Sequence, residues 1–134
     1  MQLSFAIYGL ASRMARLHKP FLEPLGLTFP QYLAMLELYT GTPRYVSDLG
    51  NSLGMDTGTI TPLLKRMEVQ GLVTRTRDPK DERRVLVSLT AKGEELKAQV
   101  WGVCDSIDGE CPLSAREVIT LRDTLNGLLQ PDQN

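Results

Sequence analysis

Residues 56–89 read DTGTITPLLKRMEVQGLVTRTRDPKDERRVLVSL, and this stretch decides the fold. In its first half, apolar residues recur at spacings of three and four positions, the pattern of a helix that buries one face. These residues are Ile60, Leu63, Leu64 and Met67. The second half is rich in strand-favouring residues on both sides of DPKD at 78–81, which is a turn sequence. A helix followed by a β-hairpin over residues 72–89 is therefore predicted.

The start of this helix has two readings. Asp56 or Thr57 can cap it by accepting a hydrogen bond from a free backbone N–H of the first turn. A helix that starts there contains Pro62 in its interior and loses one backbone hydrogen bond. A start near Thr59 places the proline in the first turn, where it costs none. The sequence leaves both boundaries open.

A shorter helix is expected immediately upstream. Residues from about Val46 to Leu53 would bury Leu49 and Leu53, and Gly54 permits a sharp turn after them. Helix, tight turn, helix and hairpin is the order of a winged helix-turn-helix, whose second helix fits the roughly 12 Å wide major groove of DNA. The predicted fold class is therefore mainly α with a small β-hairpin wing.

Longer helices are expected on both sides of this unit. Residues 3–21 place apolar side chains at alternating steps of four and three, which marks a seam along one helix face. Thr28 and Gln31 form a capping-box pattern for a helix that runs to about Tyr39. After the hairpin, Thr90 and Ser114 are the caps of two further helices. The three seams are Leu3, Ile7, Leu10, Met14, Leu17 and Phe21, then Leu96, Val100, Val103 and Ile107, and finally Val118, Leu121, Leu125 and Leu128.

Length and composition favour one domain. The 134 residues, 42% of them hydrophobic, suffice for one core, and no apolar run approaches the roughly 20 residues that span a bilayer. With no signal-type N-terminus either, the expected location is the cytoplasm. The net charge of -1 does not itself indicate a nucleic-acid partner. However, residues 55–84 hold seven basic and five acidic side chains, whereas residues 94–134 hold three and eight. One basic segment is therefore available to face phosphates.

The sequence carries no catalytic or metal-binding pattern. It has no phosphate-binding glycine loop and no nucleophile paired with a base, and one histidine limits acid–base chemistry. That residue, His18, is expected to be a partly buried hydrogen-bonding side chain rather than a ligand. We therefore expect neither an enzyme nor a resident metal or cofactor.

Cys104 and Cys111 are the only thiols, and their spacing matches no zinc signature. A disulfide across the break between the last two helices, or exchange with a small thiol, would make them redox-active. Most free cysteines of cytoplasmic proteins are instead buried as small hydrophobic residues. Both readings stay open.

Polar residues of the second helix and the hairpin form the candidate DNA-binding set. Threonine hydroxyls near the helix start suit phosphates or base edges, and arginines at the hairpin tip can enter an adjacent minor groove. Each part has a simpler reading, because helix-start threonines cap, basic pairs are often solvated and charged turns favour solubility. The set is Thr57, Thr59, Thr61, Lys65, Arg66, Arg75, Arg77, Asp81, Arg83 and Arg84, with Arg83 and Arg84 at the tip.

The same segments resemble the MarR family of winged-helix regulators. The resemblance covers nearly the whole chain and is carried by DTGTITPLLKRME at 56–68, GLV at 71–73, DERR at 81–84 and LT at 89–90. It implies a homodimer that represses transcription at a palindromic operator and is released by an effector. It also implies that Arg83 enters the minor groove and that Asp81 positions it.

The resemblance further divides the single domain, residues 1–134, into two regions. Residues 28–89 would be the DNA-binding region, and residues 1–27 with 90–134 the helical dimerisation region. The first and last helices would form the dimer interface, which fits their apolar seams. Packing of these seams inside one chain is the alternative.

Within that family the chain most resembles the branch that senses organic hydroperoxides and other oxidants, through QLSFAIY at 2–8, KP at 19–20 and LTFPQYL at 27–33. In that branch a reactive cysteine occupies the position of Ser4, and nearby tyrosines hydrogen-bond to it. A serine hydroxyl cannot be oxidised to a sulfenic acid, so a sensor with Ser4 is silent to peroxide at this position. Tyr8 matches the pattern, whereas His18 and Phe29 stand where two further tyrosines are expected.

Two explanations for this effector pocket stay open: an engineered replacement of the cysteine, or a natural member of the branch that senses something else. For the whole chain, the leading prediction is a DNA-binding repressor. The alternative is a winged-helix module that binds proteins, which would need an apolar, uncharged recognition face.

Overall fold

The computed structural model describes residues 2–129, and its helix-turn-helix follows from local sequence. α3 (Val46–Leu53) ends at Gly54, whose φ of 67° lies in the left-handed region and turns the chain. α4 (Thr57–Val69) begins where the Asp56 carboxylate accepts a hydrogen bond from the Thr59 N–H at 3.0 Å. The predicted turn and cap are thereby confirmed.

Pro62 lies inside α4, because this helix begins at Thr57 and not near Thr59. The proline has no N–H, so the carbonyl of Gly58, one turn earlier, loses its helical partner. Both residues are exposed, so water can satisfy this carbonyl and the helix continues.

The hairpin forms as predicted, with one strand added. β2 (Val73–Asp78) and β3 (Asp81–Leu89) pair antiparallel on either side of Pro79 and Lys80. A third strand, β1 (Arg44–Tyr45), pairs with β3, so the sheet order is β1-β3-β2. We did not predict β1 from the sequence, because two residues are too few to show an alternating pattern.

Arg83 and Arg84 do not lie at the hairpin tip, where the sequence had placed them. The tip consists of Pro79 and Lys80, and the two arginines are the third and fourth residues of β3. The Asp78–Asp81 pair already closes the ladder beside the turn, so residues after Asp81 belong to the strand.

Two helices precede the helix-turn-helix. α1 (Gln2–Leu22) is followed by a short 3-10 turn, η1 (Glu23–Leu25), and then by α2 (Phe29–Leu38). The predicted capping box of α2 is confirmed, since the Thr28 N–H donates to the Gln31 side chain at 3.1 Å and the Gln31 N–H to the Thr28 hydroxyl at 3.3 Å.

Three helices follow the wing, where two had been expected. Thr90 caps α5 (Ala91–Glu95), but the helix is interrupted at Leu96 before α6 (Lys97–Glu110). Ser114 caps α7 (Ala115–Leu129) as predicted, accepting a hydrogen bond from the Glu117 N–H at 3.2 Å. None of the described helices has both the length and the apolar character needed to cross a membrane.

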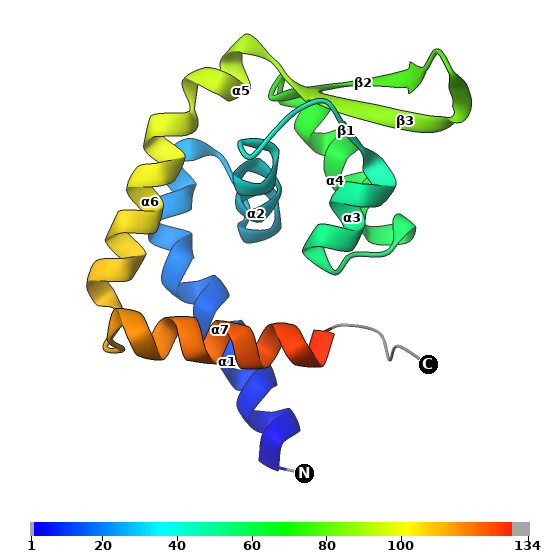
Figure 1. The fold of residues 1–134 in the computed structure, drawn as a ribbon. Helices are drawn as coiled ribbons and strands as arrows, with labels where there is room; N and C mark the ends of the chain where they lie inside the picture. The colour runs from blue at the N-terminus through cyan, green and yellow to red at the C-terminus, as the bar shows by residue number, and fades with distance from the viewer. Residues whose placement is uncertain (1, 130–134) are drawn as a thin grey trace, which may run out of the picture.

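The core lies around α2, between the helix-turn-helix and the pair formed by α1 and α6 (Figure 1). Val100 and Val103 of the α6 seam are buried in it, so this seam packs inside the chain. The other fully buried aliphatic residues and Met come from α1, α2, α3, α4 and the base of the wing: Leu22, Met35, Leu38, Leu49, Ile60, Leu64, Met67, Val73 and Val87.

Two apolar seams remain exposed. The first half of α1 presents Leu3, Phe5 and Ile7 to solvent, although its second half packs against the core through His18 and Leu22. Along α7, Val118 and Leu121 are exposed as well. Most of the two seams is therefore exposed in a single chain, in contrast to the seam of α6.

Candidate nucleic-acid interface

The sequence predicted correctly which side of α4 is buried. Ile60, Leu63, Leu64 and Met67 lie in the core, whereas Thr57, Thr59, Lys65 and Arg66 are exposed and Thr61 is half-buried. The spacing of four residues places Thr57, Thr61 and Lys65 along one flank, and Thr59 with Arg66 lies on the other. The outward surface of α4 therefore carries hydroxyls and two cations.

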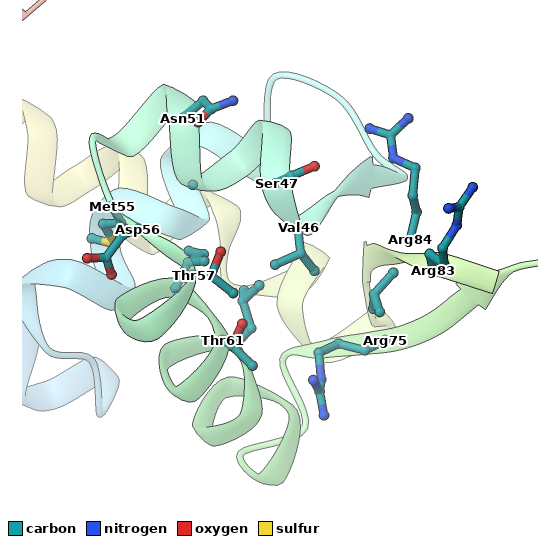
Figure 2. A pocket seen from close by; sticks show the side chains of 14 residues that line it. Val46, Ser47, Asn51, Met55, Asp56, Thr57, Thr61, Arg75, Arg83 and Arg84 are labelled. Atoms are coloured by element: carbon teal, nitrogen blue, oxygen red, sulfur yellow. The ribbon is translucent and has the colours of Figure 1, made fainter. Parts of the chain in front are cut away.

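A groove of about 430 Å³ lies between α3, α4 and the wing. Its floor is apolar and includes Val46, Ile60 and Leu64, while hydroxyl, amide and guanidinium groups form its walls. Figure 2 shows Thr57 and Thr61 between α4 and α3, with Arg83 and Arg84 projecting from the wing. The second helix and the wing thus share one polar surface.

Arg83 is the arginine most available to a partner. Its side chain is 92% exposed, and the Asp81 carboxylate accepts a hydrogen bond from its backbone N–H at 3.2 Å and from its Nε at 3.4 Å. The Asp81 carboxylate therefore orients Arg83 without covering it.

The two arginines of β2 are engaged within the chain. Arg75 forms an ion pair with Glu68 of α4 at 3.2 Å, and its backbone N–H donates to the same carboxylate at 3.0 Å. Arg77 donates to the Glu82 carbonyl at 2.7 Å. These contacts connect β2 to α4 and to β3, so both arginines have fewer donors free for DNA than the sequence suggested.

Arg84 also has partners in the chain. Its guanidinium carbon lies 3.4 Å from the centre of the Tyr45 ring, and its Nη2 lies 3.7 Å from Asp48 of α3. Tyr45 in turn donates a hydrogen bond to Asp78. This bond and the Lys80 N–H hold the pKa of the Asp78 carboxyl below its ordinary value.

The four residues of the expected effector pocket do not meet within one chain. Ser4 and Tyr8 are exposed on the first half of α1, with Tyr8 77% exposed. His18 is 95% buried, packs 4.6 Å from the Phe29 ring and donates through Nδ1 to the Met14 carbonyl at 2.7 Å. Ten residues of helix separate Tyr8 from His18, roughly 15 Å along the axis. A pocket that contains all four would need a second chain.

Comparison with known proteins places this arrangement in a family. A profile of the SarA/Rot transcriptional regulators matches residues 16–100. The organic hydroperoxide resistance transcriptional regulator of Bacillus subtilis is 42% identical over 129 residues, covering 96% of this chain and 88% of that protein. The chain belongs to the MarR-type transcriptional regulators.

Solved structures agree with the regulator's winged-helix fold. The structure of reduced AbfR bound to DNA, from Staphylococcus epidermidis, matches with a TM-score of 0.80 at 30% identity, over 95% of this chain and 91% of that one. CouR from Rhodococcus jostii matches with a TM-score of 0.84 at 24% identity, over 98% and 94% of the two chains, which supports the fold alone. Since these relatives are regulators, the expectation that the chain is not an enzyme is confirmed.

The regulator's cysteines are both half-buried, and the structure excludes a disulfide between them while α6 is intact. Cys111 directly follows the last residue of α6, seven positions after Cys104, so the helical rise holds their Cα atoms roughly 10 Å apart, beyond the about 7 Å that a disulfide allows. Cys104 instead lies 2.9 Å from the Tyr32 hydroxyl. Burial and this contact raise the pKa of Tyr32 well above its ordinary value.

Sequence reasoning missed Tyr45 and Asp78, the residues that connect the wing to the regulator's helices. Asp78 was visible only as part of a turn sequence, and Tyr45 falls in the unpredicted strand β1. The one signal available was Asp78 itself, an acidic residue in a hairpin otherwise rich in arginine.

Proposed function

We propose that the regulator binds duplex DNA as a homodimer in the cytoplasm, with α4 in the major groove and Arg83 in the adjacent minor groove. The observation that carries this proposal is the shared surface of α4 and the wing. Thr57 and Thr61 line this surface together with Arg83, which is almost fully solvated, and Thr59, Lys65 and Arg66 are exposed elsewhere on α4. Such a charged surface does not suit the alternative of a protein-binding module.

The relatives support this proposal. The solved structures of AbfR include reduced and overoxidised forms bound to DNA, at 30% and 31% identity to this chain. The Bacillus subtilis relative is named for resistance to organic hydroperoxides. We therefore propose a repressor whose operator affinity is controlled by an oxidant or a small molecule.

The exposed seams of α1 and α7 are the proposed dimer interface. Their apolar side chains gain by leaving water, and a second copy would supply a matching surface. Two copies related by a two-fold axis would present two α4 helices to a palindromic operator. An effector that shifts the α1 or α7 contacts would change the spacing of these helices and release the DNA.

The test begins with selection of duplexes of about 30 base pairs from a random-sequence pool by the wild-type chain. Fluorescence anisotropy of a selected duplex is then measured across a series of salt concentrations. We expect enrichment of a palindrome and an affinity that falls steeply with salt, because bound cations displace counterions.

Arg83→Ala is the first variant to examine. We expect affinity to fall by about tenfold and the salt slope to decrease by about two, one for each wing of the dimer. Arg116→Ala, an exposed arginine at the start of α7, is the matched control and is expected to bind as the wild type does. Failure to enrich any duplex would contradict DNA binding, and unchanged binding by Arg83→Ala would contradict the role of the wing.

A further inference from the structure

Tyr45 crosses the whole wing sheet. It belongs to β1 and pairs with Leu86 of β3, yet its hydroxyl donates to the carboxylate of Asp78 on β2, the far strand. A side chain that pairs with one strand and bonds to the next lies across the strand between them. Tyr45 therefore connects all three strands on one face of the sheet.

Asp78 is a buried carboxylate, only 6% exposed, beside the tip of the hairpin. One oxygen accepts from Tyr45, and the other accepts from the Lys80 N–H at 2.9 Å. A buried carboxylate without hydrogen-bond donors destabilises the folded state, so Asp78 can be buried only because these two groups donate to it. The bond to Lys80 also fixes the backbone of the turn.

Arg84 completes the connection to the helix-turn-helix. Its guanidinium lies over the Tyr45 ring and reaches Asp48 on α3. The arginine thus bridges the wing strand and the helix that precedes α4. Its side chain is 40% exposed, against 92% for that of Arg83 next to it. The two adjacent arginines are therefore in different situations: Arg84 packs against Tyr45 and Asp48, whereas Arg83 is held by Asp81 at its Nε and is almost fully exposed to solvent.

We propose that Tyr45, Asp78 and Arg84 form a wing anchor, which holds the wing at a set position relative to α3 and α4 so that Arg83 meets DNA already in place. This inference rests on the proposed function and names the residues that position its wing. Tyr45 acts as a positioning residue and does not touch DNA. Arg84, which the sequence had placed in the minor groove, becomes part of the anchor.

The physical advantage is preorganisation. A two-stranded hairpin beyond the end of β1 has few long-range contacts, so an unanchored wing would lose conformational freedom on binding. With the anchor in place, that ordering occurs on folding instead. Weakening the anchor is then expected to lower DNA affinity through Arg83, although no contact with DNA is removed.

The test uses Tyr45→Phe, which keeps the ring beneath Arg84 and removes only the hydroxyl that bonds to Asp78. We expect about fivefold weaker binding to the selected duplex, from the looser wing. In the Arg83→Ala background the same substitution is expected to have no further effect, because an unfixed wing matters only through Arg83. Amide hydrogen exchange at residues 80–84 is expected to be faster in Tyr45→Phe and unchanged in α6.

Tyr39→Phe is the matched control. Tyr39 also donates its hydroxyl to a partner in the chain, the Gly93 carbonyl at 2.7 Å, but it lies at the other end of the sheet from the hairpin tip. Loss of this hydrogen bond is expected to lower the stability of the fold and to leave DNA affinity and amide hydrogen exchange in the wing unchanged. A general stability effect on binding would appear in both variants, whereas a positioning effect appears only in Tyr45→Phe.

The outcomes separate the two proposals. A wild-type chain that enriches no duplex overturns the proposed function and the positioning role together. Normal DNA binding with unchanged exchange in Tyr45→Phe overturns the anchor alone. Faster exchange in Tyr45→Phe without a loss of DNA affinity would overturn the positioning role. The same loss of DNA affinity from Tyr45→Phe in the Arg83→Ala background as in the wild type would also overturn it, because Tyr45 would then not act by placing Arg83.

Discussion

Gly93 marks the place where the wing joins the helices that follow it. It is buried in α5, and a Cβ there would overlap the backbone carbonyl oxygen of Leu72 and press on Leu89. The Gly93 carbonyl also accepts the hydrogen bond from Tyr39. Only a residue without a side chain allows α5 to lie this close to the base of the sheet.

Gly93→Ala is therefore expected to lower the free energy of unfolding by about 2 kcal/mol, because backbone must shift to admit the methyl group. The measurement is urea unfolding followed by circular dichroism at one protein concentration. Gly102→Ala is the control, since a Cβ at Gly102 in α6 meets nothing within 4 Å. There the better helix propensity of alanine is expected to raise stability by about 0.5 to 1 kcal/mol. Equal stabilities for the two variants would contradict the close approach at Gly93.

Single residues were predictable where they act on near neighbours. Asp56, Thr28 and Ser114 cap helices through N–H groups three residues away, so their role is written in the local sequence. Tyr45 was not predictable, because its partner Asp78 lies 33 positions along the chain. No periodicity or spacing rule connects two such residues.

α1 is one helix with two environments. Its second half packs on the core through His18 and Leu22, whereas its first half is exposed and carries Ser4 and Tyr8 one turn apart. The seam predicted along the whole helix is therefore divided between packing inside the chain and an exposed surface. Periodicity identifies an apolar face but not the surface that covers it.

Ser4→Cys is expected to make this half of α1 sensitive to peroxide. The new thiolate would attack the O–O bond of cumene hydroperoxide, form a sulfenic acid and release the alcohol. A polar sulfenic acid in the proposed dimer interface is expected to weaken operator binding. The measurement is anisotropy of the selected duplex before and after one equivalent of hydroperoxide per chain.

The wild type, which has serine at this position, is the control and is expected to keep its affinity. Equal release in the wild type would instead assign the response to Cys104 or Cys111, and Cys104→Ala would then identify which. No release in Ser4→Cys would contradict the proposed proximity of this position to the interface.

Among the strands and the later helices, the elements that depend on tertiary contacts could not be predicted from local sequence. The hairpin was predicted from turn chemistry and strand-favouring residues, whereas β1 exists only because β3 offers it a pairing edge. The interruption between α5 and α6 could not be predicted either, because the residue at the break is Leu96 and not a helix-breaking glycine or proline. Strand β1 and the interruption at Leu96 both depend on the tertiary contacts of the segment and not on its local sequence.

On the scale of the molecule, α1 and α7 carry most of the large hydrophobic side chains that are exposed in the described chain. Phe5 is 78% exposed and Leu128 is 64% exposed, values typical of a surface that another copy covers. The proposed DNA-binding surface lies on α4 and the wing and is formed by different residues. The chain thus separates an apolar surface for association from a cationic one for recognition.

Leu121→Glu on α7 is expected to shift the regulator toward monomer, because a charge would be buried in the proposed interface. Light scattering after size exclusion measures the mass, and anisotropy is expected to show at least tenfold weaker binding to the palindrome through loss of the second α4. Ala98→Glu, exposed on α6, is the control and is expected to stay dimeric. A dimeric Leu121→Glu variant with normal binding would contradict the role of α7.

From its sequence alone the chain could be assigned a winged helix-turn-helix, a buried face of α4 and a cationic recognition surface, because caps, turns and apolar periodicity act between neighbours along the chain. The tertiary structure was needed to show that Arg83 is almost fully exposed while Arg84 packs on Tyr45, and that Cys104 lies against Tyr32 and not near Cys111. Those outcomes depend on partners 39 and 72 positions apart, which folding alone brings into contact.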